Sequence, residues 1–128
     1  MIPDGMTYDV YAQNCPTRMV LDRLADKWVV LILLHLSKGR CRFNALRRAV
    51  QGVSQKVLSQ TLKALERDGL ITREAFATVP VTVEYAITPL GTTLVGTLDG
   101  LRVWAESNMD AVISARAAFD AKKAEAEA

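Results

Sequence analysis

The 128-residue sequence predicts one domain that is mainly α-helical and carries a small β-hairpin. Three observations predict this α+β class. Apolar residues recur with helical spacing over most of the chain, and two β-rich segments cover 70–76 and 81–87. A short loop, 77–80, joins these two segments. Because half of the residues are hydrophobic, the chain holds enough apolar side chains for a core.

The first part of the chain is expected to contain an arm and two helices. Residues 1–14 show no apolar period and are interpreted as the N-terminal arm. Pro16 suits the first turn of a short helix, because the missing N–H costs nothing there. Asp26 is the expected N-cap of a second helix over 27–37. This helix is apolar nearly all round, so it should be the buried centre of the domain.

Two short helices joined by a tight turn are expected in the middle of the chain. The first covers 43–50, and Gly52 lies in the turn. Ser54 should cap the second helix, 55–68, which Gly69 ends. Two such helices followed by a hairpin make a winged helix-turn-helix, which we place at residues 15–88.

The remaining chain is expected to form two helices, 89–106 and 108–119, and a flexible tail over 120–128. Their apolar stripes exceed what one small core needs, so they predict dimerisation helices and a homodimer. The residues expected at the dimer interface are Leu94, Leu98, Leu101, Trp104, Val112 and Phe119. Gly91, Gly96 and Gly100 mark either places of close helix approach or a helix that tolerates glycine.

Positive charge is concentrated in the middle of the sequence. Residues 40–73 hold eight basic and two acidic side chains, a net charge of +6, while the rest of the chain carries −4. A basic middle between acidic flanks predicts a surface that binds a polyanion. A solvated surface that happens to be basic is the alternative.

The helix 55–68 offers side chains that suit base edges in the major groove of DNA. The residues expected to read bases are Ser54, Gln55, Lys56, Ser59 and Gln60. The residues expected to contact phosphates are Arg42, Arg47, Arg48, Lys63 and Arg73. A polar solvent face on an ordinary amphipathic helix is the alternative. The combination of the basic stretch, the helix-turn-helix spacing and the hairpin favours double-stranded DNA as the partner.

The two cysteines differ in their expected chemistry. Cys15 precedes Pro16 at a helix N-terminus and lies near Arg18, and both features lower a thiol pKa. It is therefore a candidate for redox sensing, although a small buried hydrophobe is an alternative interpretation. Cys41 lies between two arginines and is interpreted as a packing residue, and its part in sensing stays open.

Other function classes find no support in the sequence. No cysteine, histidine and carboxylate spacing suggests a metal site, and His35 is interpreted as a core residue. No Gly-rich phosphate loop or Gly-x-Ser-x-Gly motif is present, so we expect neither an enzyme nor a cofactor. Without a secretion signal or a membrane-length apolar run, a cytoplasmic protein without membrane contact is expected.

Seven stretches, in the same order over residues 10 to 105, resemble the HxlR family of bacterial winged-helix regulators. They are Cys15-Pro16, Asp26-Lys27-Trp28, 42–47, 53–58, 65–70, Val83-Glu84-Tyr85 and 88–91. The resemblance implies a transcriptional regulator that binds a pseudo-palindromic operator as a homodimer, often near its own gene. It also implies a sensory cysteine for redox or electrophile signals at the position of Cys15.

Two further hypotheses and one departure from the family remain. A small aromatic or quinone-like effector between the long helix and the winged domain could control DNA binding instead. The winged helix could also serve protein–protein contact alone, without DNA. The departure is Thr82, which stands where similar proteins often carry a basic wing residue, and the loop 77–81 is uncharged. Arg73 or Arg42 is then expected to supply the phosphate contact.

Overall fold

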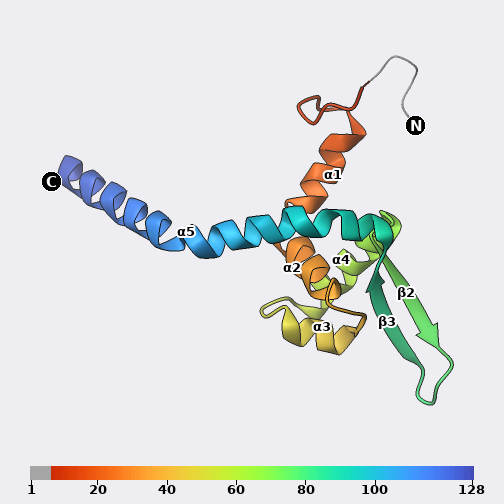
Figure 1. Cartoon of the computed structure of the whole chain (residues 1–128). Helices are drawn as coiled ribbons and strands as arrows, with labels where there is room; N and C mark the ends of the chain where they lie inside the picture. The colour runs from red at the N-terminus through yellow and green to blue at the C-terminus, as the bar shows by residue number, and fades with distance from the viewer. Residues whose placement is uncertain (1–6) are drawn as a thin grey trace. The chain divides into compact units, whose positions relative to one another are not determined.

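The computed structural model describes residues 7–128, so residues 1–6 of the expected arm lie outside the described part (Figure 1). It confirms a mainly helical fold with a small antiparallel sheet. The chain divides into two compact units, and the boundary between them in the sequence falls between Val95 and Gly96. In chain order the elements are α1 (Pro16–Leu24), α2 (Lys27–Leu36), β1 (Cys41–Arg42), α3 (Phe43–Ala49), α4 (Gln55–Arg67), β2 (Ile71–Phe76), β3 (Thr82–Ile87) and α5 (Pro89–Glu127).

The helix α2 provides the centre of the first unit, as its sequence predicted. Asp26 caps it, and the Asp26 carboxylate accepts hydrogen bonds from the backbone N–H groups of Trp28 at 2.8 Å and Val29 at 3.4 Å. Side chains from α3, α4 and β2 surround it in a core with almost no exposed surface. This core contains Val29, Ile32, Leu33, Leu36, Leu46, Leu58, Leu62, Leu65 and Ile71. His35 lies beside this core, half-buried rather than enclosed.

The sheet has three strands in the order β1-β3-β2, all antiparallel. The sequence predicted only the hairpin β2–β3, which forms the wing. The additional strand, β1, is two residues long and pairs Cys41 with Tyr85 and Arg42 with Glu84. A strand of two residues is too short to show the alternation of apolar and polar residues that marks a strand in a sequence. Only its pairing with β3 in the fold reveals it. It fixes the start of α3 against the wing.

A cap at Thr88 ties the end of the wing to the end of α4. The Thr88 hydroxyl donates to the Gly69 carbonyl at 2.6 Å and accepts from the Gly91 N–H at 3.0 Å. The Thr88 N–H donates to the Leu70 carbonyl at 3.0 Å. Gly69 itself has φ +78°, a left-handed conformation that glycine adopts without strain. This junction sets the direction in which α5 begins.

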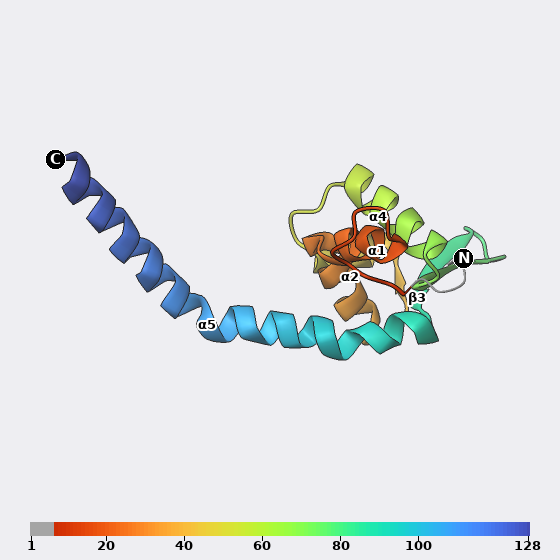
Figure 2. The ribbon, with the colours of Figure 1, turned by 90° about the horizontal axis from the view of Figure 1, so that it is seen from above.

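The prediction of two C-terminal helices was wrong, because α5 is one helix of 39 residues (Figures 1 and 2). The expected break near Ser107 does not occur. Asn108 donates its side-chain amide to the Trp104 carbonyl at 2.9 Å instead of capping a new helix. Residues 120–127, which we expected to fray, also lie in the helix.

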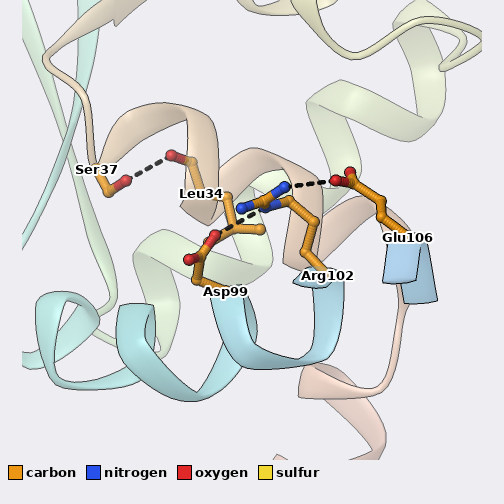
Figure 3. A network of polar contacts seen from close by, with 5 residues as sticks. All are labelled: Leu34, Ser37, Asp99, Arg102 and Glu106. Atoms are coloured by element: carbon orange, nitrogen blue, oxygen red, sulfur yellow. Dashed lines mark hydrogen bonds and ion pairs between the residues drawn. The ribbon is translucent and has the colours of Figure 1, made fainter. Parts of the chain in front are cut away.

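Two ion pairs lie along α5, within the part that the sequence analysis predicted as the helix 89–106. Arg102 donates to Asp99 at 2.8 Å and to Glu106 at 2.7 Å, as Figure 3 shows. These partners lie three and four residues away, on the same side of the helix. Figure 3 also shows how α2 ends, where the Ser37 hydroxyl donates to the Leu34 carbonyl.

Candidate nucleic-acid interface

The helix-turn-helix consists of α3, a short turn and α4. Gly52 in the turn has φ +91°, which a side chain at this position would strain. Ser54 caps α4, since its hydroxyl accepts a hydrogen bond from the Val57 N–H at 3.1 Å. Leu58, Leu62 and Leu65 bury one side of α4 and leave the other side open to solvent.

The residues predicted to read bases lie on this open side. Gln55, Lys56 and Gln60 are exposed, and Ser59 is half-buried. Ser54 is exposed, but its oxygen is already used in the cap, so we expect it to position α4 as well. Gln60 also lines a hollow between α1, α2 and α4. The structure therefore brings the five together at one end of α4, and their contacts with bases remain a prediction.

The predicted phosphate residues carry free positive charge. Arg42, Arg47, Arg48, Lys63 and Arg73 are all exposed, and within residues 7–128 none of them forms an ion pair. Arg40, which also belongs to the basic stretch, differs. It lies 3.4 Å from a carboxylate oxygen of Glu74 and 3.8 Å from one of Glu84. These two glutamates face each other across the hairpin, so Arg40 offsets their repulsion rather than offering charge to DNA.

The register of the sheet separates Arg42 from Arg73. Arg42 pairs with Glu84, which also pairs with Glu74, so these three side chains share one face. Arg73 pairs with Tyr85 and points to the opposite face. The two arginines that were expected to replace a basic wing therefore do not form one cluster.

The tip of the wing is apolar and fully open. Val79 is completely exposed, and Val81 is 67% exposed. The Thr78 hydroxyl donates to the Pro80 carbonyl at 2.7 Å and lies 3.2 Å from the Thr82 hydroxyl, so the loop is ordered by its own contacts. The tip carries no charged side chain that could contact a phosphate.

Cys15 lies in a small polar environment at the start of α1. Its Sγ accepts a hydrogen bond from the Asp9 N–H at 3.3 Å and lies 3.0 Å from the Thr17 hydroxyl. These contacts, with that of Thr17 the larger, lower the pKa of the Cys15 thiol. The direction of the shift agrees with the sequence analysis, and the Thr17 backbone N–H at the helix N-terminus contributes as expected, whereas Arg18 does not contribute. Arg18 donates to the Tyr11 carbonyl at 3.3 Å instead.

Cys41 lies in an environment that disfavours its thiolate, unlike Cys15. It is half-buried in β1, and this burial raises the pKa of its thiol although the nearby Arg48 partly opposes the effect. Both cysteines are free thiols. In the sequence, Cys15 was marked by its position before Pro16. Its contacts with the Asp9 N–H and the Thr17 hydroxyl were missed, because neither group forms part of a recognisable sequence motif.

Cys15 is expected to react with iodoacetamide at lower pH than Cys41. The alkylation rate of a thiol rises with pH until the thiol is ionised, so the lowered pKa of Cys15 makes its profile level off earlier. The variants Cys41→Ser and Cys15→Ser each keep one cysteine, and mass spectrometry can follow each profile separately. The opposite order of the two profiles would contradict this thiol environment.

The residues predicted at a dimer interface differ in exposure. Leu101, Trp104 and Phe119 are 57%, 59% and 68% exposed, while Leu94 and Val112 are half-buried and Leu98 is buried. The sequence analysis missed a second apolar surface on α1, which has no buried residue. There Met19 is 71% exposed and Val20 is 50% exposed.

Other kinds of site find no support in the part of the chain that the structure describes. No three histidine, cysteine or carboxylate side chains in residues 7–128 come together as a metal site. Among the helices in the same range, none is both long and apolar enough to cross a membrane.

An exposed polar helix after a tight turn, followed by a hairpin, defines a winged helix-turn-helix DNA-binding protein. The profile of the HxlR-like helix-turn-helix family matches residues 23–113. The chain is 44% identical over 108 residues to the HTH-type transcriptional regulator YtfH of Escherichia coli strain K12, covering 84% of this chain and 86% of YtfH. The chain therefore belongs to the HxlR-like helix-turn-helix family, whose relatives are named as transcriptional regulators rather than enzymes.

Two solved structures are similar to this fold. The transcriptional regulator ytfH from Salmonella typhimurium has a TM-score of 0.80 and 42% identity, and the match covers 86% of this chain and 98% of that one. The redox regulator HypR in its reduced form has a TM-score of 0.71 and 36% identity, and the match covers 77% and 98%. These similarities agree with the winged helix-turn-helix expected from the sequence.

Proposed function

We propose that this transcriptional regulator binds a pseudo-palindromic operator as a homodimer and that oxidation of Cys15 changes its affinity for DNA. The observation that carries the sensing part is the thiol of Cys15, held by Asp9 and Thr17 in an environment that favours the thiolate. The similarity to HypR, which is named a redox regulator, supports the same assignment.

The expected chemistry is attack of the Cys15 thiolate on a hydroperoxide. An S–O bond forms, the O–O bond breaks, and the products are a sulfenic acid and an alcohol or water. Only 8% of Cys15 is exposed, which favours small oxidants. The added oxygen must fit where Sγ now contacts Asp9 and Thr17, so oxidation disturbs the start of α1.

An ion pair connects α1 to the reading helix. Arg23 in the last turn of α1 lies 3.0 Å from the carboxylate of Asp68, the C-cap of α4. A displaced α1 would therefore act on the end of α4 opposite to its DNA-reading end. Through this contact between Arg23 and Asp68, a movement of α1 would reach α4.

The homodimer is supported by exposed apolar side chains rather than by a second chain. Leu101 and Trp104 on α5 and Met19 on α1 expose more than half of their surface. Leu101 and Trp104 lie three residues apart on α5, so they form one continuous apolar surface, and such a surface is typical of a protein interface. A homodimer would also supply the two reading helices that a pseudo-palindromic operator requires.

A second candidate signal is a small apolar ligand. Residues of the arm and α1 line an almost wholly apolar groove next to the Cys15 position, formed by Tyr8, Val10, Pro16, Thr17, Val20, Leu21 and Leu24. A groove of this composition suits an aromatic molecule without a charge. Under this alternative, DNA affinity changes with ligand and not with oxidant.

The first experiment is fluorescence anisotropy of the protein on DNA from upstream of its own gene, with reduced protein and after a mild hydroperoxide. We expect nanomolar affinity in the reduced state and a loss of tenfold or more after oxidation. Equal affinity in both states would contradict sensing by Cys15, while the proposal that the protein is a DNA-binding regulator would stand. No salt-dependent binding in either state would contradict the whole proposal.

A further inference from the structure

A polar hollow lies at the C-terminal end of α3, on the side of the helix-turn-helix that precedes the reading helix. Its lining consists of Asn44, Arg47, Arg48, Gln51, Gly52 and Val53. Asn44, Arg47 and Arg48 follow the spacing i, i+3 and i+4 and share one side of α3, while Gln51 lies in the turn after the helix and lines the same hollow. The sequence analysis singled out only the two arginines.

The polar side chains of this hollow are available to a ligand. All four are exposed, and within residues 7–128 none forms a side-chain hydrogen bond or an ion pair. Arg23, Arg40 and Arg102 pair with carboxylates, whereas Arg47 and Arg48, like Arg42 and Arg73, form no ion pair within residues 7–128. Two guanidinium groups without a carboxylate attract an anion.

The chemistry of the four side chains fits the oxygens of a phosphate. A guanidinium donates two parallel hydrogen bonds to a phosphate, and the amide groups of Asn44 and Gln51 donate one or two more. The first helix of a helix-turn-helix crosses the DNA backbone when the second lies in the major groove. We propose that this hollow binds one phosphodiester of the DNA backbone and that Asn44 and Gln51 are positioning residues within it. This proposal rests on the proposed function.

A phosphate bound in the hollow would hold α4 at a fixed depth in the major groove of DNA. Gln51 lies four residues before Gln55 in the sequence, and Gly52 and the cap at Ser54 fix the chain between them. A phosphate bound at Gln51 therefore determines where the first turn of α4 meets the base edges. Such a contact sets register and affinity without reading sequence.

A purely structural role for the arginines makes a different prediction. Arg47 and Arg48 lie in the last turn of α3, where positive charge interacts favourably with the helix dipole. In that case their removal lowers stability and leaves the salt dependence of DNA binding unchanged. Asn44 and Gln51 then have no effect on binding.

The test uses the full-length reduced protein and two duplexes, DNA from upstream of its own gene and a shuffled sequence of the same length and composition. Arg47→Ala should reduce the slope of log affinity against log salt by about 0.9 on both. The double variant Asn44→Ala, Gln51→Ala should lose about tenfold on both with an unchanged slope. Lys123→Ala, which removes one exposed charge from the end of α5, is the matched control and should change affinity less than twofold.

Gln51→Glu provides a second variant that changes the shape of the side chain very little. Its carboxylate repels a phosphate, so it should bind both duplexes more weakly than the double variant does. Wild-type affinity in these variants, or a loss confined to the upstream sequence, would overturn the phosphate site. Failure of the wild-type protein to bind either duplex would instead overturn the proposed function and this inference together.

Discussion

The Cys15→Ser variant is expected to bind operator DNA as the reduced protein does and to keep that affinity after oxidation. Serine has nearly the shape of cysteine, and its hydroxyl can keep the contacts with the Asp9 N–H and the Thr17 hydroxyl. It cannot form a sulfenic acid, so the proposed response of tenfold or more disappears. Fluorescence anisotropy with and without hydroperoxide measures this difference.

Cys41→Ser is the matched control, because it also removes one thiol. Its oxidant response should equal that of the wild type, since burial raises the pKa of Cys41 and disfavours its thiolate. If Cys15→Ser keeps the response and Cys41→Ser loses it, sensing belongs to Cys41. If a variant that carries both Cys15→Ser and Cys41→Ser responds to an uncharged aromatic compound, that compound acts without a thiol, as the alternative of the apolar groove beside α1 requires.

Gly91→Ala is expected to destabilise the fold by about 2–3 kcal/mol, the upper range for an overfilled site. A Cβ at this position would overlap the Leu70 carbonyl oxygen and lie 2.7 Å from Cγ1 of Ile87. The Leu70 carbonyl already accepts the Thr88 N–H at 3.0 Å, so its movement would also disturb the cap of α5. Urea denaturation at one fixed protein concentration measures the change.

Gly96→Ala provides the opposite outcome in the same helix. A Cβ at Gly96 meets no atom of this chain within 4 Å, so the substitution should stabilise the helix by about 0.5–1 kcal/mol. Equal effects of the two substitutions would contradict the close contact at Gly91. A destabilised Gly96→Ala variant whose dimer also dissociates more readily would place Gly96 in the interface between two chains.

Local signals in the sequence predicted most of the first unit. The caps Asp26 and Ser54 and the stop at Gly69 are determined by the residue and its near neighbours, and the structure places each where it was expected. The stripe of leucines in α4 is equally local, because helical spacing alone defines it. These features need no knowledge of distant parts of the chain.

Features that depend on distant residues were missed or placed wrongly. The strand β1 exists because Cys41 meets Tyr85, and the pairing of Arg40 with Glu74 depends on the same sheet. Of the three glycines in α5, only Gly91 shows a close approach within this chain, and its spacing does not distinguish it. The break expected near Ser107 does not occur, and the Asn108 amide bonds back to the Trp104 carbonyl within the continuous helix.

The candidate site shows the same division. The types and spacing of Gln55 and Lys56 indicated the reading surface, and both are exposed there. The hydrogen-bond partners of Cys15 and the orientation of Arg42 and Arg73 on opposite faces could only come from the folded chain.

The uncharged tip of the wing bears on how the protein searches a genome. Positive side chains attract any stretch of DNA, and random sites outnumber an operator by many orders of magnitude. At Val79 and Val81 the tip of the wing offers no such attraction, so non-specific adhesion depends on the basic side chains of the helix-turn-helix and of the strands β1 and β2. We therefore expect less time to be lost on random DNA, and we expect a rise in salt to weaken the contacts of these basic side chains without weakening any contact of the uncharged tip.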